Sequence, residues 1–230
     1  MTQLTLRGIT VHYGRDRALD NVDLAFPATG LVVIAGPNGS GKSTLLDVIA
    51  GVVMPSAGCI AQPSGETINR GELRRHVARL HQRTVLPYDT TVSELLGFAA
   101  QYRRTADLWV KASPPVLGEP IAQLLGAGGI DAMGSVSMER LSGGQQRLCM
   151  VAATLLTDRR ILLFDEPLAG LAPSCARIFV TLAHHVAETR LVVIVDHESQ
   201  SLHPIAERIV LLDAGRIVGV QRRDGEAADG

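Results

Sequence analysis

Hydrophobic and polar positions along the chain predict buried strands that alternate with helices. Apolar residues recur over residues 4–13 and alternate with polar ones over 22–26, which predicts two strands near the N-terminus. Short, wholly apolar runs at 31–35, 161–164 and 191–195 predict strands that are buried on both faces. Strands that alternate with helices in this way are typical of an α/β fold with a largely parallel sheet.

The stretch of residues 83–139 has a different character from the rest. It contains helical pieces at 92–102 and 121–125, a proline-rich break at 113–115 and a glycine cluster at 126–129. We therefore predict a core formed by residues 1–82 and 146–220, with an antiparallel β subdomain at its N-terminal end. Residues 83–145 are expected to form an inserted α-helical lobe, and residues 221–230 a polar tail.

The composition of the chain limits the kinds of function that it can have. The chain has 230 residues, 46% of them hydrophobic and 20% charged, with a net charge of -1, so no overall attraction to nucleic acid is expected. Its three cysteines are widely spaced and suggest neither a disulfide framework nor a zinc site. The apolar runs are too short to span a bilayer, so a membrane role would need a partner. Arginines at 70, 74, 75, 79 and 83 are interpreted as a solvated face, because no aromatic residues lie among them.

A glycine-rich segment follows the buried run 31–35 and leads into a predicted helix at 42–50. It matches the phosphate-binding loop pattern G-x-x-x-x-G-K-[ST] over Gly36, Pro37, Asn38, Gly39, Ser40, Gly41, Lys42, Ser43 and Thr44. Glycines let successive backbone N–H groups point at phosphate oxygens, and the start of the helix adds its positive dipole end. We expect Lys42 to reach the β- and γ-phosphates and the Ser43 hydroxyl to ligate Mg²⁺.

Two carboxylates end the apolar run 161–164. Asp165 and Glu166 would lie at the carboxyl end of a buried strand, where ligands of open α/β sheets bind. Taken alone, such a pair is more often a solvated strand end. Downstream of a phosphate loop, Asp165 is predicted to hold Mg²⁺ and Glu166 to polarise the attacking water.

The segment Leu141, Ser142, Gly143, Gly144 and Gln145, followed by Gln146 and Arg147, resembles the signature of ATP-binding-cassette ATPases. Ser142 is expected to open a helix, so that the amides of the two glycines can cradle an anion. The resemblance implies that this surface faces the γ-phosphate held by a second ATPase subunit. The implied assembly is a head-to-tail dimer with ATP in its interface.

Other positions of that family match in order along the chain, from about residue 4 to residue 220. Tyr13 matches the aromatic residue that stacks on adenine, although a core strand tyrosine is the alternative. Gln82 matches the glutamine that contacts Mg²⁺ and water, and His197 the histidine that contacts the γ-phosphate. For both, a structural polar residue at a strand end is the alternative.

One departure from the family pattern falls in the loop after the acidic pair. Ala172 stands where the family usually carries an aspartate that helps one site sense the other. Nucleotide binding should be unaffected, whereas coupling between the two sites is in question. We hypothesise either slower hydrolysis or a heterodimer whose partner supplies the missing group.

The resemblance implies an enzyme that binds and hydrolyses Mg-ATP as the motor subunit of a transporter. It would lie on the cytoplasmic face of the membrane, held there by a separate permease subunit received near Gln82 and residues 83–94. The alternatives are an ATPase outside transport, such as a cofactor-assembly scaffold, and a nucleotide-dependent regulatory module. Intact Glu166 and His197 count against the regulatory module, and Ala172 counts weakly for it.

Overall fold

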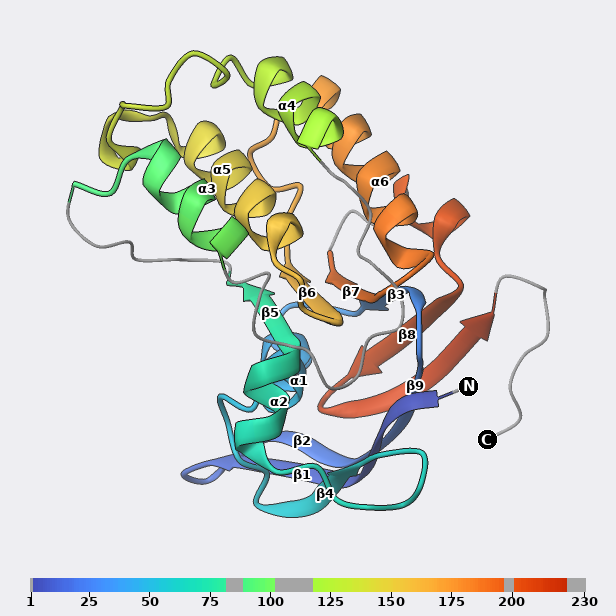
Figure 1. Cartoon of the computed structure of the whole chain (residues 1–230). Coiled ribbons are helices and arrows are strands. Elements are labelled where there is room, and N and C mark those ends of the chain that lie inside the picture. The colour runs from blue at the N-terminus through green and yellow to red at the C-terminus, as the bar shows by residue number, and fades with distance from the viewer. Residues whose placement is uncertain (1, 82–88, 102–117, 197–200, 223–230) are drawn as a thin grey trace.

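The computed structural model describes residues 2–81, 89–101, 118–196 and 201–222. Two sheets and a layer of helices are stacked on one another: a small antiparallel sheet at one end, a large sheet in the middle and most helices at the other end (Figure 1). Among the described residues, no helix combines the length and the apolar character that crossing a membrane requires.

The small sheet has the strand order β2-β1-β4, built from β1 (Thr2–Tyr13), β2 (Asp16–Pro27) and β4 (Ala57–Ala61). All its pairings are antiparallel. Alternate residues of β1 and β2, such as Leu6 and Leu24, pair across the ladder and are buried. This period of two puts one apolar face against the rest of the core. The antiparallel β subdomain predicted at the N-terminal end is confirmed.

The large sheet has the order β5-β6-β7-β3-β8-β9. Its strands are β3 (Gly30–Ala35), β5 (Val77–Leu80), β6 (Ile161–Asp165), β7 (Leu191–Val195), β8 (Arg208–Asp213) and β9 (Arg216–Arg222). All neighbours are parallel except β8 and β9. Every residue of β6 and β7 is buried, as expected for parallel strands covered on both faces.

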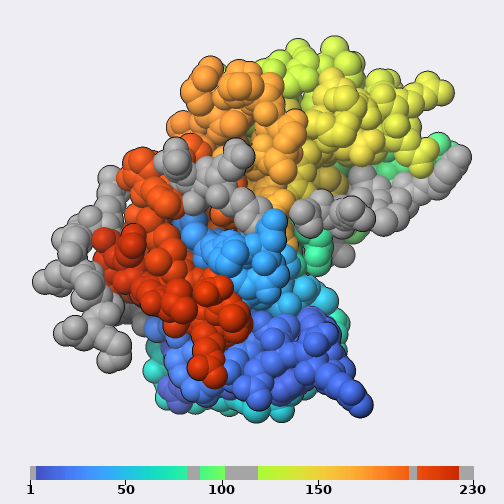
Figure 2. Space-filling model, turned by 180° about the vertical axis from the view of Figure 1, so that it is seen from behind, coloured from blue at the N-terminus to red at the C-terminus, as the bar shows by residue number. Residues whose placement is uncertain are grey.

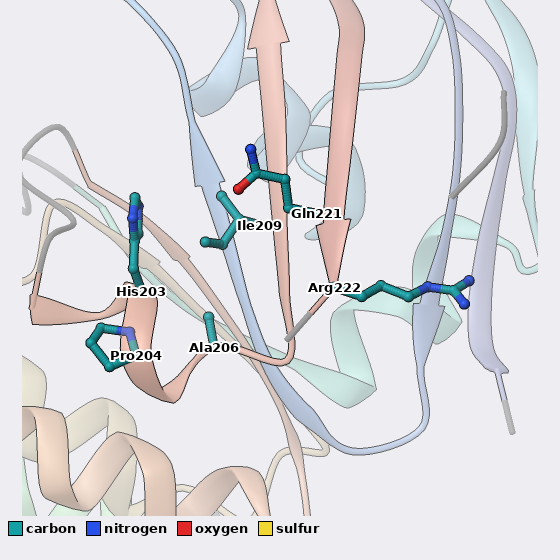
Figure 3. Close-up of a pocket in the computed structure, with 6 residues that line it drawn as sticks. All are labelled: His203, Pro204, Ala206, Ile209, Gln221 and Arg222. Carbon is teal, nitrogen blue, oxygen red and sulfur yellow. The ribbon is translucent and has the colours of Figure 1, made fainter. Parts of the chain in front are cut away.

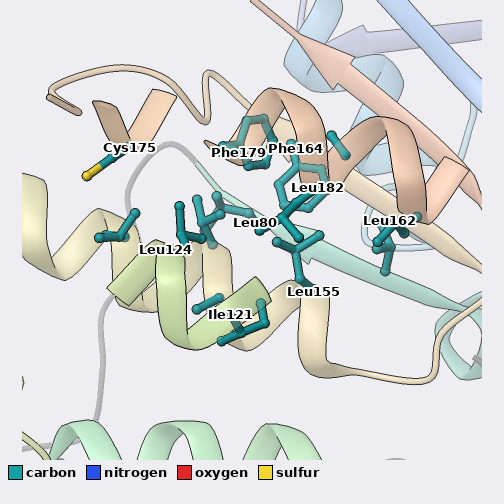
Figure 4. Packing of buried hydrophobic residues seen from close by; sticks show 14 of the residues in the cluster. Leu80, Ile121, Leu124, Leu155, Leu162, Phe164, Cys175, Phe179 and Leu182 are labelled. Carbon is teal, nitrogen blue, oxygen red and sulfur yellow. The ribbon is translucent and has the colours of Figure 1, made fainter. Parts of the chain in front are cut away.

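Helices cover the two faces of the large sheet. Helix α1 (Lys42–Ile49) shares a hydrophobic cluster with the small sheet, and α2 (Arg70–His76) adds Leu73 to it. Helices α3 (Val92–Gln101), α4 (Gly118–Ala127), α5 (Gly143–Leu156) and α6 (Pro173–Ala187) form the opposite layer. In this layer the rings of Phe164 and Phe179 pack edge to face, with their centroids 5.3 Å apart (Figure 4). Short 3₁₀ turns occur at Met138–Arg140 and His203–Ile205.

Seen from behind, the N-terminal strands lie at one end of the molecule and the helical layer at the other (Figure 2). The C-terminal strands flank the segment that contains β3 and α1 in this view. The predicted fold class, a mainly parallel α/β core with a helical lobe, is confirmed.

Strand β4 and helix α2 have no clear signal in the hydrophobic pattern of the sequence. In β4 only Ile60 and Ala61 are buried, which leaves no alternating pattern to recognise. In α2 only Leu73 is buried, and the N-cap is Asn69, whose side chain accepts a hydrogen bond from the Glu72 N–H. Each element has only one or two buried residues, which is too few to produce a hydrophobic periodicity in the sequence.

Candidate nucleotide-binding site

The glycine-rich segment connects the buried strand β3 to α1, as the sequence predicts. Gly36 and Gly41 have φ values of 153° and 101°. A Cβ on Gly36 would overlap the Leu212 carbonyl, and one on Gly41 would overlap the Ala18 carbonyl. The loop can therefore fold this tightly against β8 and β2 only because both positions are glycine.

Lys42 is buried and folds back over the loop that precedes it. Its Nζ donates hydrogen bonds to the carbonyl oxygens of Gly36 at 2.8 Å and Pro37 at 2.7 Å. Burial lowers the pKa of Lys42, while the nearby charges of Glu166 and Asp165 act in the opposite direction. The ammonium group is thus fixed inside the curve of the loop.

Two observations indicate that this loop fits an anionic group. The Ser40 hydroxyl oxygen is buried and has no hydrogen-bond partner among the described residues. The first turn of α1 has neither a capping side chain nor an acidic residue, so its N–H groups remain for an external acceptor. An orphaned hydroxyl, free helix-end amides and a buried ammonium group together suit the oxygens of a phosphate chain.

The acidic pair lies at the same edge of the sheet as this loop. Asp165 is opposite Val195 in the β6–β7 ladder, and Val195 is opposite Ile34 in the β7–β3 ladder. Asp165 is buried, and Glu166 directly follows with a φ of 51°. The Glu166 N–H donates to the Val195 carbonyl at 2.8 Å, which fixes this turn to the neighbouring strand.

Arg79 links three parts of the site and was misinterpreted from the sequence. Its side chain is only 6% exposed, so the prediction of a solvated face is wrong for this residue. Its guanidinium pairs with Asp47 of α1, contacts Asp165 Oδ2 at 3.4 Å and donates to the Ser43 carbonyl at 3.2 Å. The available signal was a charged residue set between apolar Ala78 and Leu80, because buried charges are rare unless they are paired.

Arg147 approaches the acidic pair from the helical layer. It lies on α5 and donates to the carbonyl oxygens of Asp165, Glu166 and His81, the last two at 2.8 and 2.7 Å. Burial lowers its pKa, and the charges of Asp165 and Glu166 oppose that shift. Its position after the signature segment was noted from the sequence, but its partners were not.

The signature segment begins α5 as predicted. Ser142 is the N-cap, its Oγ accepts from the Gln145 N–H, and the Gln145 side chain accepts from the Ser142 N–H at 3.1 Å, which completes a capping box. Ser142 and Gly143 are exposed, while a Cβ on Gly144 would come within 2.7 Å of the Gly170 carbonyl. The hydroxyl proton of Ser142 is still available to an acceptor outside the chain.

The remaining predicted residues are placed as follows. Tyr13 ends β1 beside a tight turn and is 51% exposed, so its side chain is accessible from outside the chain. Gln82 and His197 lie outside the described residues. Ala172 is the N-cap of α6, with no side-chain hydrogen bond at that position and Pro173 next to it.

A separate pocket of about 270 Å³ lies beside β8, β9 and the 3₁₀ turn His203–Ile205. It is lined by His203, Pro204, Ala206, Ile209, Gln221 and Arg222. Figure 3 shows the Arg222 side chain directed away from the other five residues. The lining contains none of the predicted site residues.

The fold and the site define an ATP-binding cassette: a P-loop at the carboxyl edge of a parallel sheet, an acidic pair beside it and a capped signature helix. The ABC transporter family matches residues 19–169, more than half of the chain. The chain belongs to this family and is an ATP-binding domain of it.

Curated relatives agree with this assignment. The chain is 30% identical to the sulfate/thiosulfate import ATP-binding protein CysA of Rhodopseudomonas palustris, covering 93% of this chain and 61% of that protein. It is 31% identical to the ribose import ATP-binding protein RbsA of Chelativorans sp., covering 94% of this chain and 42% of that protein. The chain thus spans about three fifths or less of the length of these two relatives.

Solved structures show the same fold. One is described as the dimeric structure of a bacterial ABC transporter cassette, with a TM-score of 0.79, 24% identity and coverage of 97% of this chain and all of that one. Another is the ATP-binding subunit of an ABC transporter, with a TM-score of 0.79 and 22% identity, covering 97% of this chain and 91% of that chain.

Proposed function

We propose that this chain hydrolyses Mg-ATP as the motor subunit of an ABC importer. The observation that carries the proposal is the convergence of buried Lys42 and buried Asp165 on one edge of the sheet, with Glu166 next in sequence. The relatives CysA and RbsA are both named import ATP-binding proteins but serve different solutes. Their shared part is therefore the ATP-driven step, not the recognition of a cargo.

Lys42 and the N–H groups at the start of α1 bind the phosphate chain in this proposal, and the Ser40 hydroxyl gains an acceptor. Ser43, Asp165 and Gln82 are the residues that would hold Mg²⁺, which neutralises charge on the phosphate oxygens when bound. Glu166 orients the attacking water and takes its proton at the carboxylate, and His197 contacts the γ-phosphate. Tyr13 stacks on the adenine through its accessible ring.

The signature surface supports a second subunit. The Ser142 hydroxyl and the amides of Gly143 and Gly144 stand at the start of α5, where a helix favours negative charge. We propose that they contact the γ-phosphate bound by another ABC ATPase subunit, so that two ATP molecules are enclosed in the dimer. Residues 83–145 relay the resulting motion to a permease, which holds the chain at the cytoplasmic face of the membrane.

The test is Mg-dependent ATP hydrolysis by the purified chain beside its Glu166→Gln and Lys42→Ala variants. We expect Glu166→Gln to keep ATP affinity and to lower kcat by about 10²–10⁴-fold, the usual loss for a general base. Lys42→Ala should weaken ATP binding by about 10–100-fold, since a hydrogen bond to a charged group contributes about 1.5–3 kcal/mol.

The outcomes separate the hypotheses. Turnover by the wild type that Glu166→Gln abolishes supports a self-sufficient ATPase. ATP binding without turnover in any variant would indicate that a partner must complete the site, either a cassette with the aspartate that Ala172 replaces or the permease. ATP binding that is unaffected by Lys42→Ala would count against the proposed phosphate site.

A further inference from the structure

The side chain of Arg147 joins the signature helix directly to the backbone of the acidic pair. Its Nη2 donates to the carbonyl oxygens of Asp165 and Glu166, and its Nη1 to that of His81. The three carbonyls belong to the ends of the adjacent parallel strands β5 and β6 or to the residues that follow them. One planar guanidinium thus spans two strand ends at the edge where nucleotide binds.

By binding the two carbonyls of the acidic pair, Arg147 helps to fix the turn that carries the Glu166 side chain. Glu166 has a φ of 51°, a left-handed conformation that costs a non-glycine residue free energy and persists only when its surroundings hold it. Its N–H is bound to Val195 on one side, and its carbonyl is bound to Arg147 on the other. The direction of the carboxylate therefore depends on the guanidinium as well as on β7.

The same helix connects this contact to the signature surface. Arg147 lies five positions after the N-cap Ser142, which is about 7.5 Å along a helix axis. Gly144, between them, approaches the Gly170 carbonyl so closely that a Cβ would come within 2.7 Å of it. The exposed start of α5 and the loop of the acidic pair are thus joined by one capped helix and by the close approach of Gly144 to Gly170.

The positive charge of Arg147 is not explained by packing alone. Neutral carbonyls need only a neutral donor, yet here a cation is partly removed from water to reach them. Its positive charge interacts with the carboxylates of both Asp165 and Glu166. A group that costs free energy to bury is expected where its geometry has a use.

We propose that Arg147 is a positioning residue that holds Glu166 in the orientation required for ATP hydrolysis. The inference rests on the proposed function of Glu166 as the group that orients water. In this proposal Arg147 acts by binding the carbonyls on both sides of the Cα of Glu166. It also makes that orientation depend on the position of α5.

The experiment is a double-mutant cycle between Arg147 and Glu166. ATP affinity and single-turnover hydrolysis of radiolabelled ATP are measured for wild type, Arg147→Met, Glu166→Gln and the double variant. Misplacement of a catalytic group by about 1 Å costs up to roughly 10²-fold. We therefore expect Arg147→Met to lower the hydrolysis rate about 10–100-fold with ATP affinity changed less than about threefold. In the Glu166→Gln background the same change should cost less than about threefold, because the group it positions is gone.

Controls separate this role from a purely structural one. Arg140→Met removes an exposed arginine of the same layer and should leave the rate unchanged. Arg147→Lys keeps one charged donor and should recover part of the rate, whereas Arg147→Gln should recover less. If Arg147→Met does not fold, as judged by circular dichroism and urea unfolding, the cycle is run with the Lys and Gln variants.

Two results would overturn the proposal. An equal fold-loss in both backgrounds would mean that Arg147 acts independently of Glu166, and an unchanged rate in the wild-type background would mean that it positions nothing. If the Glu166→Gln variant hydrolyses ATP as fast as wild type, the proposed role of Glu166 is wrong. That result is independent of the Arg147 variants.

Discussion

The guanidinium of Arg79 lies 3.4 Å from Asp165 Oδ2, and the two side chains are 6% and 4% exposed. They lie on the adjacent strands β5 and β6, and Arg79 also pairs with Asp47 of α1. The carboxylate beside the phosphate loop is therefore held by a cation from a different strand.

Replacing Arg79 with Met should destabilise the protein markedly. Asp165 would remain buried without its cation, and breaking such a pair from one side costs about 3–5 kcal/mol. The free energy of unfolding in urea is the measurement, with Arg75→Met, an exposed arginine on α2, as the matched control. The control should change by no more than about 0.5 kcal/mol. Equal changes in the free energy of unfolding for the two variants would show that the Arg79–Asp165 pair contributes nothing to stability.

The backbone at Glu166 predicts an unusual order of stabilities. Because its φ is 51°, glycine should fit this position better than alanine, by about 1 kcal/mol. Glu166→Gly and Glu166→Ala both lack the carboxylate and differ by one methyl group, so each controls for the other. Urea unfolding should rank the glycine variant as more stable. The reverse order would mean that the left-handed turn is not adopted in solution.

Ala172 leaves the start of α6 without a capping side chain, at φ -63° and ψ 148°, values that suit an N-cap. Ala172→Asp should therefore stabilise the protein by about 1 kcal/mol, seen as a higher Tm. Ala172→Glu brings the same charge on a longer side chain and should gain less. The Ala172→Asp variant also tests coupling: an ATPase rate and cooperativity equal to wild type would refute the idea that the missing aspartate weakens communication between sites.

Burial raises the pKa of the Cys149 thiol to about 11. The group ionises more readily in the unfolded chain, where its pKa is about 8.5, so its contribution to stability is complete below that pH and is lost as pH rises toward 11. The loss should approach about 1.4 kcal/mol per pH unit between these values. Urea unfolding of wild type and Cys149→Ala at pH 8 and pH 10.5 measures it. Parallel pH profiles for the two proteins would contradict this assignment.

The sequence alone determined the features that are encoded in neighbouring residues. The phosphate loop could be predicted because Gly36 and Gly41 set a local backbone path between a buried strand and a helix. The start of α5 could be predicted because Ser142 and Gln145 cap the helix from three residues apart. The fully buried strands, β3 among them, could be predicted because each is a short run of apolar residues. The alternation of these runs with helices such as α1 predicts the parallel core.

Elements with few buried residues could not be predicted in this way. Strand β4 and helix α2 are stabilised by contacts with β1 and the end of α1, including hydrogen bonds from Arg70 to the Gly51 and Val52 carbonyls. These contacts join residues that are far apart in the sequence, and no periodic pattern records them.

Only the tertiary structure decided which charges surround the acidic pair. Arg79 and Asp165 are separated by 86 positions in the chain, and the strand order β5-β6 brings them together. Arg147 reaches the carbonyls of Asp165 and Glu166 because α5 packs over the ends of these strands. Local sequence specifies a turn or a cap, since its hydrogen bonds close within a few residues. The partner of a buried arginine is specified by strand order and helix packing, which depend on the whole chain at once.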